Sequence, residues 1–220
     1  MNFDPTTRDF LSGATFSNAH RFELGNAGRA PRRVERLVEL CRGQRVLHVG
    51  CCDHLDLIRA KVPQGVYLHQ QLSAVASRCV GMDINPEGIA LLHELGFPEV
   101  FTPDTVPDDD FDLCLLGDVI EHVGDVATFL KSMARYRFER LVVATPNAFR
   151  LRNFLSRGEL INTDHRYWFS PFTLGKVAHD AGWRLESFHY IDSPFTRGMR
   201  GMIQSRYPML RETLVGILTP

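Results

Sequence analysis

The segment 111–123, with the sequence FDLCLLGDVIEHV, constrains the fold more than any other part of the chain. Its first half is an apolar run of strand length that ends at Gly117, and such runs between turn signals predict buried strands. Asp118, Glu121 and His122 follow directly. Open α/β sheets bind ligands just beyond the carboxyl ends of their parallel strands. The segment therefore predicts a buried strand followed by two carboxylates and a histidine, a side-chain type suited to acid–base chemistry.

Strand-like apolar runs alternate with helical patterns along the chain. We predict strands over residues 44–50, 78–84, 98–102, 111–117, 140–144, 183–191 and 212–218, and helices over 30–41, 67–76, 85–96, 125–136 and 170–181. This alternation indicates an α/β fold with a doubly wound, mostly parallel sheet. Right-handed crossovers bring the carboxyl ends of such strands to one edge. Four of those ends carry unusual residues: Gly50-Cys51-Cys52-Asp53, Asp83, Gly117-Asp118 and Thr145-Pro146-Asn147.

Charge and hydropathy narrow the class of partner. The 220 residues and a hydrophobic fraction of 44% suit one domain with a full core. Twenty-five Lys and Arg residues balance 26 Asp and Glu residues, which gives a nucleic-acid partner no electrostatic support. No apolar run is long enough to span a bilayer, and the N-terminal residues lack the basic-then-apolar pattern of a secretory signal. We expect a cytoplasmic protein.

The number and spacing of the cysteines also indicate a cytoplasmic protein. Their number, five, is odd, Cys51 and Cys52 are adjacent, and the sequence contains no CxxC pair. Disulfide frameworks pair an even number of cysteines, and structural zinc sites place their cysteine and histidine ligands at characteristic spacings. This usage is typical of a reduced, cytoplasmic chain.

Two strand ends together favour a nucleoside-containing cofactor. Gly50 follows the first strand, where a glycine lets the backbone approach a ligand closely. Asp83 ends the second strand, where a carboxylate can accept both hydroxyls of a ribose. Each has an ordinary alternative, namely a plain turn for Gly50 and a share in capping the next helix with Asn85. The further glycines of a dinucleotide fingerprint are missing, as is a phosphate-binding GxxxxGK[ST] loop.

The segments VLHVGCC, GMDI, FDLCLLGDVIEHV, VVATPNAF and AGWRLESF resemble class I S-adenosylmethionine-dependent methyltransferases. The resemblance is to the group that includes the ubiquinone-pathway O-methyltransferases and many sugar and small-metabolite enzymes. It covers about residues 34–191 and extends to 212–218. It implies a Rossmann-like seven-stranded sheet with an antiparallel last strand. We accordingly expect one domain over 1–220, made of a helical cap (1–42), a core (43–192), a lid or contact segment (193–211) and the last strand (212–220).

The resemblance implies that Gly50 lies against the methionine part of S-adenosylmethionine, and that His48, Cys51 and Gly117 also contact the cofactor. Two positions depart from the family pattern. His48 stands where the family usually has an acid that helps to hold the ammonium group of the cofactor, and Cys52 stands in place of a glycine. A neutral His48 can still accept a hydrogen bond, whereas a protonated one would repel the ammonium.

The remaining cofactor contacts are implied in the same way. Asp83 would hold the ribose hydroxyls, and Ile84 would pack on the adenine. Asp104 would approach the adenine amine, although its surroundings match the family poorly. Asp118 would line the junction between cofactor and acceptor and take part in catalysis.

An alcohol acceptor must lose a proton, so a base of near-neutral pKa is useful. His165, in the loop after the fifth strand, is the first candidate, and Asp164 could orient it. His122 is the second candidate. We expect Glu121, Asn147, Asp164 and Tyr167 to contact the acceptor. A cation held by Asp118, Glu121 and His122 is a weaker alternative because further ligands are not visible, so we predict no metal.

The segment 196–211 mixes arginines with apolar residues and could form a lid, a homodimer contact or a surface for a lipid-linked substrate. Packing within the fold is the simpler interpretation, and membrane contact is not expected. Arg29, Arg32 and Arg33 could meet an anionic substrate.

The sequence thus predicts an S-adenosylmethionine-dependent O-methyltransferase that acts on a hydroxyl of a sugar, glycan intermediate or small metabolite. An N-methyltransferase of a small molecule is one alternative. A non-catalytic cofactor-binding scaffold or partner subunit is another, because of His48 and Cys52.

Overall fold

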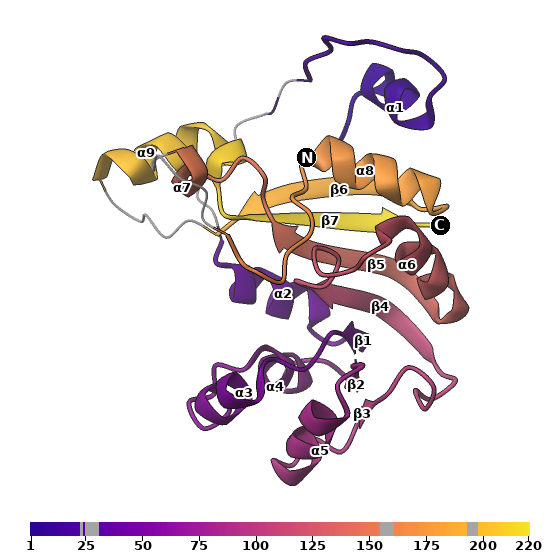
Figure 1. The fold of residues 1–220 in the computed structure, drawn as a ribbon, viewed down its shortest axis with the longest axis vertical. Coiled ribbons are helices and arrows are strands. Elements are labelled where there is room, and N and C mark those ends of the chain that lie inside the picture. Colours follow the sequence, from indigo (N-terminus) through magenta and orange to yellow (C-terminus); the bar gives the residue numbers. More distant parts are fainter. Residues whose placement is uncertain (23, 25–30, 155–160, 193–197) are drawn as a thin grey trace.

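The computed structural model describes residues 1–22, 24, 31–154, 161–192 and 198–220. A seven-stranded sheet in the order β3-β2-β1-β4-β5-β7-β6 forms its centre (Figure 1). The strands are β1 (Arg45–Val49), β2 (Arg78–Met82), β3 (Val100–Phe101), β4 (Asp110–Gly117), β5 (Arg137–Pro146), β6 (Arg184–Ile191) and β7 (Thr213–Thr219). The first five run parallel, and β7 runs antiparallel to both of its neighbours. The predicted fold class, with its antiparallel last strand, is confirmed.

Helices join most of the strands. They are α1 (Pro5–Ser12), α2 (Arg33–Cys41), α3 (Leu55–Lys61), α4 (Leu68–Ser73), α5 (Pro86–Glu94), α6 (Val126–Ser132), α7 (Leu151–Phe154), α8 (Pro171–Asp180) and α9 (Gly198–Arg206), with 3₁₀ turns η1 (Met133–Arg135) and η2 (Pro208–Leu210). Capping side chains start the predicted helices α5 and α8, as Asn85 and Ser170 accept backbone N–H bonds in the first turn. The short helices α1, α3, α7 and α9 were not predicted.

The alternation of side chains along β4 divides the core into two layers. Cys114 and Leu116 point to the layer that also contains Leu130 of α6 and Leu174 of α8. Leu113 and Leu115 point to the other layer, with α2 and α4. Every one of these side chains is fully buried, as expected for a strand covered on both faces. Figure 1 shows α6 and α8 on one side of the sheet and α2 on the other.

The ends of the chain join this frame at different places. Helix α1 packs on α8, and Met1 pairs through its backbone with Phe188 of β6. In the segment expected to be a lid or contact, residues 198–206 form α9, while 193–197 lie outside the described residues. Within the described part of the chain, no helix has the length and apolar character needed to cross a bilayer.

Candidate active site

The turn after β1 needs a glycine. Gly50 has a φ of +70°, a left-handed conformation that side chains disfavour. A Cβ atom there would lie 2.4 Å from Cγ2 of Val119, well inside van der Waals contact. The Gly50 N–H donates to the Met82 carbonyl of β2 over 2.8 Å. The turn therefore passes tightly between the ends of β2 and β4.

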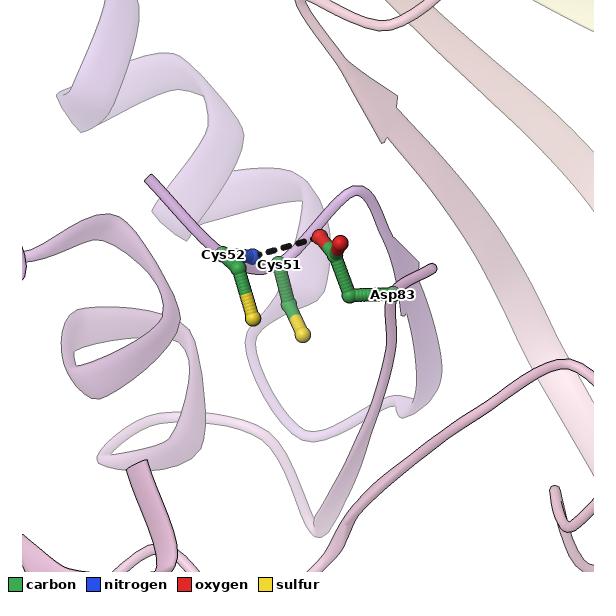
Figure 2. Close-up of side chains that lie close together, drawn as sticks. All are labelled: Cys51, Cys52 and Asp83. Carbon is green, nitrogen blue, oxygen red and sulfur yellow. Dashed lines mark hydrogen bonds between the residues drawn. The ribbon is translucent and has the colours of Figure 1, made fainter. Parts of the chain in front are cut away.

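Asp83 is fixed beside this turn. Its carboxylate accepts the N–H of Cys52 over 2.8 Å and the N–H of Asn85 over 2.9 Å. Figure 2 shows the first of these bonds and the thiols of Cys51 and Cys52 next to the carboxylate. Each carboxylate oxygen keeps a lone pair, because one bond uses only part of its acceptor capacity. Asp83 lines a cavity and can accept further donors there, while its role at a ribose stays a prediction.

The other two residues predicted for the nucleoside part differ in their placement. The Ile84 side chain is 85% exposed, which is unusual for isoleucine and leaves an apolar face free for a flat ring, although Ile84 is not among the described residues that line the cavity. Asp104 lies in the exposed turn after β3 and is not among the described residues that line the cavity. The structure therefore gives Asp104 no contact that would support its predicted role.

Asp118 and Arg33 close the cavity across the end of β4. Asp118 has a φ of +57°, which aspartate tolerates better than most residues. Its N–H donates to the Ala144 carbonyl at the end of β5. Arg33, at the start of α2, donates to Oδ2 of Asp118 over 2.7 Å. Arg33 is therefore paired with an aspartate of the protein itself, and its contact with an anionic substrate stays a prediction; Arg29 lies outside the described residues.

His48 forms a buried pair with a second histidine. Its Nδ1 lies 3.2 Å from Nδ1 of His69, so one ring donates and the other accepts. Burial holds the pKa of His48 well below its usual range and lowers the pKa of His69 to about 4. Both rings are therefore neutral near pH 7, which removes the repulsion expected from a protonated His48. His48 lines the cavity, and its Nε2 has no partner among the described atoms.

These strand ends surround one cavity of about 680 Å³, within the range of small-molecule sites. Gly50, Cys51, Asp83, Gly117 and Asp118 line it, so the predicted convergence of strand ends occurs. Its lining continues to His122, which follows β4, and to Asn162, Asp164 and His165 in the loop after β5. The predicted cofactor end and the predicted catalytic end therefore belong to the same cavity.

Glu121 lies behind the catalytic end. Its side chain is fully buried, and Oε2 accepts a bond from the Thr145 hydroxyl over 3.0 Å. Its Oε1 has no partner within the described residues. Burial, with the nearby negative charge of Asp118, raises the pKa of Glu121 to about 8. Glu121 is not among the described cavity-lining residues, so direct acceptor contact, as predicted, lacks support.

The two candidate catalytic histidines lie against each other. The rings of His122 and His165 meet edge to face with centroids 4.6 Å apart. Nδ1 of His122 lies 3.2 Å from the Asp164 carbonyl, so Nδ1 carries the proton and Nε2 keeps its lone pair. His165 contacts the Asn162 amide through Nε2 over 3.1 Å. Asp164 meets His122 through its backbone and lines the cavity with its side chain.

Two predicted acceptor contacts are structural in this fold. The Asn147 amide is fully buried and donates to the carbonyls of Met209 and Arg211, which ties the end of β5 to the segment before β7. The Tyr167 hydroxyl donates to the Gly124 carbonyl over 2.6 Å. Neither is among the described residues that line the cavity.

Sequence reasoning missed the supports of the site. The segment 162–166 returns to β4, where the Arg166 N–H donates to the Glu121 carbonyl and its guanidinium donates to the His122 carbonyl. Tyr67 donates to the Cys51 carbonyl. These bonds join positions far apart in the chain, so periodicity and motifs carry no signal for them.

A family model described as "Methyltransferase domain" matches residues 19–187, which is most of the chain. The chain belongs to this methyltransferase family. The methyltransferase resembles solved S-adenosylmethionine-dependent methyltransferases from Aquifex aeolicus (16% identity, TM-score 0.55, covering 85% of this chain and 89% of that one) and Archaeoglobus fulgidus (18%, 0.52, 86% and 91%). It also resembles the magnesium protoporphyrin IX methyltransferase of Synechocystis with bound S-adenosylhomocysteine (15%, 0.53, 84% and 81%). No curated protein matches the sequence.

Solved methyltransferases with this fold are S-adenosylmethionine-dependent, and one holds S-adenosylhomocysteine; the cavity of this methyltransferase suits that cofactor chemically. Asp83 offers acceptors for ribose hydroxyls, and the exposed Ile84 offers a surface for adenine. At the other end, neutral His48 presents an unpartnered nitrogen among the described atoms near Gly117. These groups match the ribose, the adenine and the ammonium group of the cofactor in chemical type.

Proposed function

We propose that this methyltransferase transfers a methyl group to a hydroxyl of a sugar, glycan intermediate or small metabolite. One observation supports this most: the cavity that begins at Asp83 continues to a histidine pair, His122 and His165. S-adenosylmethionine, when bound, supplies an electrophilic methyl group on a sulfonium. The far end of the cavity is therefore the place for the acceptor.

The chemistry of an alcohol explains the polar far end. Transfer forms a carbon–oxygen bond, breaks the carbon–sulfur bond and releases the hydroxyl proton. Alignment of the acceptor with the methyl group supplies much of the rate. We place the hydroxyl against His122 and His165, where imidazole nitrogens can assist the loss of that proton. An amine acceptor is already nucleophilic when neutral, which makes N-methylation the second candidate.

The surroundings of the cavity suit a polar acceptor. Asn162, Asp164 and the exposed His54 line it beside the histidine pair, and hydrogen-bonding groups of this kind recognise hydroxyl-rich rings. We also propose a cytoplasmic location, because all five cysteines are free thiols, including the adjacent Cys51 and Cys52.

A binding measurement tests the cofactor site. The Asp83→Ala variant loses the acceptors for two ribose hydroxyls, each worth about 1.5–3 kcal/mol when charge-assisted. We expect S-adenosylhomocysteine to bind it at least about 100-fold more weakly in calorimetric titration. The Asp104→Ala variant is the matched control, because it removes an aspartate outside the cavity. Equal affinity of a folded Asp83→Ala protein and the wild type would contradict the site.

A mass-spectrometric screen tests the acceptor class. Purified protein is incubated with methyl-labelled S-adenosylmethionine and panels of sugars, glycan intermediates, phenols and amines. Label on oxygen supports the proposal, and label on nitrogen supports the second candidate. Tight cofactor binding without transfer to any panel would favour the non-catalytic scaffold.

A further inference from the structure

We propose that Glu121, His122 and His165 form a site for one divalent transition-metal cation at the acceptor end of the cavity. One potential ligand atom from each residue lies within 4.8 Å of the others, so a single ion can reach all three. Glu121 and His122 follow β4, and His165 belongs to the loop after β5, which bonds to the backbone at Glu121 through Arg166. The proposed cation binding is argued from this geometry alone. The role of the cation in catalysis rests on the methyltransferase function proposed above.

The carboxylate of Glu121 carries the first part of the argument. Oε1 of this fully buried residue has no hydrogen-bond partner among the described atoms. An unsatisfied carboxylate oxygen in the interior is costly, and its usual partners are donors or a cation. Oε2 is held by the Thr145 hydroxyl, which fixes the carboxylate and leaves Oε1 as the free ligand. A cation beside Oε1 would stabilise the ionised form.

The two imidazoles carry the second part. Metal-binding histidines usually donate their second ring N–H to a carbonyl or carboxylate, which orients the ring. His122 has this arrangement, since Nδ1 faces the Asp164 carbonyl and Nε2 remains available. Nδ1 of His165 is buried and unpartnered among the described residues. Coordination through this Nδ1 requires the Nε2–H tautomer, so the Asn162 amide must turn its oxygen toward the ring and give up the bond that this oxygen accepts from the Asp164 N–H.

The ligand set indicates the class of ion. Two imidazoles and one carboxylate suit zinc, iron, cobalt and related ions, whereas magnesium and calcium prefer oxygen ligands alone. Three protein ligands leave open coordination positions, the pattern of catalytic rather than structural sites. Both histidines line the cavity, so the open positions face the acceptor.

The cation gives the acceptor hydroxyl a different way to lose its proton. A bound cation lowers the pKa of an oxygen that it coordinates. The acceptor oxygen would bind as the alkoxide and form the carbon–oxygen bond as the carbon–sulfur bond breaks, and the proton would pass to water in the cavity. Histidine nitrogens that ligate the ion have no lone pair left for that proton. The cation thus replaces the histidine base that the sequence suggested.

Metal binding is tested directly, without turnover. The chelator-treated protein is titrated with Zn²⁺ and Mn²⁺ by calorimetry and with Co²⁺ by visible absorption. We expect one equivalent to bind. The Glu121→Gln and His122→Ala variants should lose at least 10-fold in affinity, and circular dichroism checks their folding. Glu121→Gln keeps the shape and the Thr145 contact, so it isolates the charge.

Two controls exclude other sites. Cys51, Cys52 and Asp83 also lie close enough to hold an ion, so Cys52→Ser must leave the affinity unchanged, as must the remote His179→Ala. Absence of binding by the wild type, or equal binding by Glu121→Gln and His122→Ala, would overturn the metal site. S-adenosylhomocysteine binding is measured on the same samples. Its loss would contradict the cofactor site of the proposed function and leave the metal result standing.

Discussion

At residue scale, Gly50 shows how the absence of a side chain shapes the site. The positive φ of Gly50 and its closeness to Val119 each disfavour a side chain at this position, for separate reasons. We predict that Gly50→Ala destabilises the protein by more than the roughly 1–2 kcal/mol of a left-handed L-residue. The Val119→Ala change removes the methyl group in the way, so the double variant should recover part of the loss. Urea unfolding of the three variants measures this coupling.

Gly43 provides the matched control. Its φ of +69° is the same in kind, and a Cβ atom there would have no described atom within 4 Å. Gly43→Ala should therefore cost only the conformational part. Equal losses for Gly43→Ala and Gly50→Ala would show that the contact with Val119 is relieved by a small backbone shift.

The buried pair His48 and His69 predicts acid sensitivity. Burial lowers the pKa of His69 to about 4, below the value of about 6.5 in an unfolded chain. The stability that the neutral ring contributes is present above pH 6.5 and is lost as the pH falls toward 4. The loss is on the order of 3 kcal/mol at most. His69→Gln should unfold with a weaker pH dependence in this window, measured by urea titration between pH 7 and 4. Parallel curves for wild type and variant would contradict this.

Residue types at strand ends predicted part of the site. Gly50, Asp83 and Asp118 could be placed because the carboxyl ends of parallel strands meet at one edge. Asn147 satisfied the same rule, but its amide bonds to backbone carbonyls. The rule gives the position of a residue, and only the packing around it decides whether its polar atoms remain available.

At element scale, capping residues matter most where helices start beside the cavity. Asn85 accepts the N–H groups of Glu87 and Gly88 at the start of α5. We predict that Asn85→Ala lowers the free energy of unfolding by about 1 kcal/mol, whereas Asn85→Asp, which keeps the acceptor, is close to neutral. Thermal or urea unfolding checks both variants. A neutral Asn85→Ala would show that solvent replaces the cap.

Strands and helices were predicted correctly where the periodic pattern of apolar residues was strong, and helices were missed where they were short. Every strand was found, since buried apolar runs identify strands well. Helix α1 was not predicted as an element although Asp4 caps it and Pro5 begins it, because eight residues are too few for a clear helical period. Helix α3 has no side-chain cap, so little in its seven residues distinguishes it from a loop.

The histidine pair shows the limit of such reasoning. Glu121 and His165 come together because Arg166 bonds to the backbone after β4. Both histidines were candidates from their own loops, yet their contact with each other depends on how one loop folds onto another. For this reason the sequence showed only Asp118, Glu121 and His122 as metal ligands and favoured no metal.

At the scale of the whole molecule, β7 links two parts of the sheet. It pairs with β5 on one side and β6 on the other. We predict that a chain shortened after residue 212 loses cooperative unfolding, because β6 then has no partner strand and the edges of β5 and β6 that faced β7 are exposed. Removal of Pro220 alone, an exposed residue outside the strand, is the control. Urea unfolding followed by fluorescence and circular dichroism measures the effect, and an unchanged transition in the shortened chain would contradict it.

The place of β7 also sets an order of events during synthesis. A ribosome makes residues 184–191 of β6 before residues 213–219 of β7, at about 5–20 residues per second. For that interval the newly made β6 has no strand beside it, and its apolar side chains must wait for the rest of the chain to emerge. The nascent protein is therefore exposed to wrong partners, and dependent on chaperones, while the residues from β6 to the end of β7 are being made.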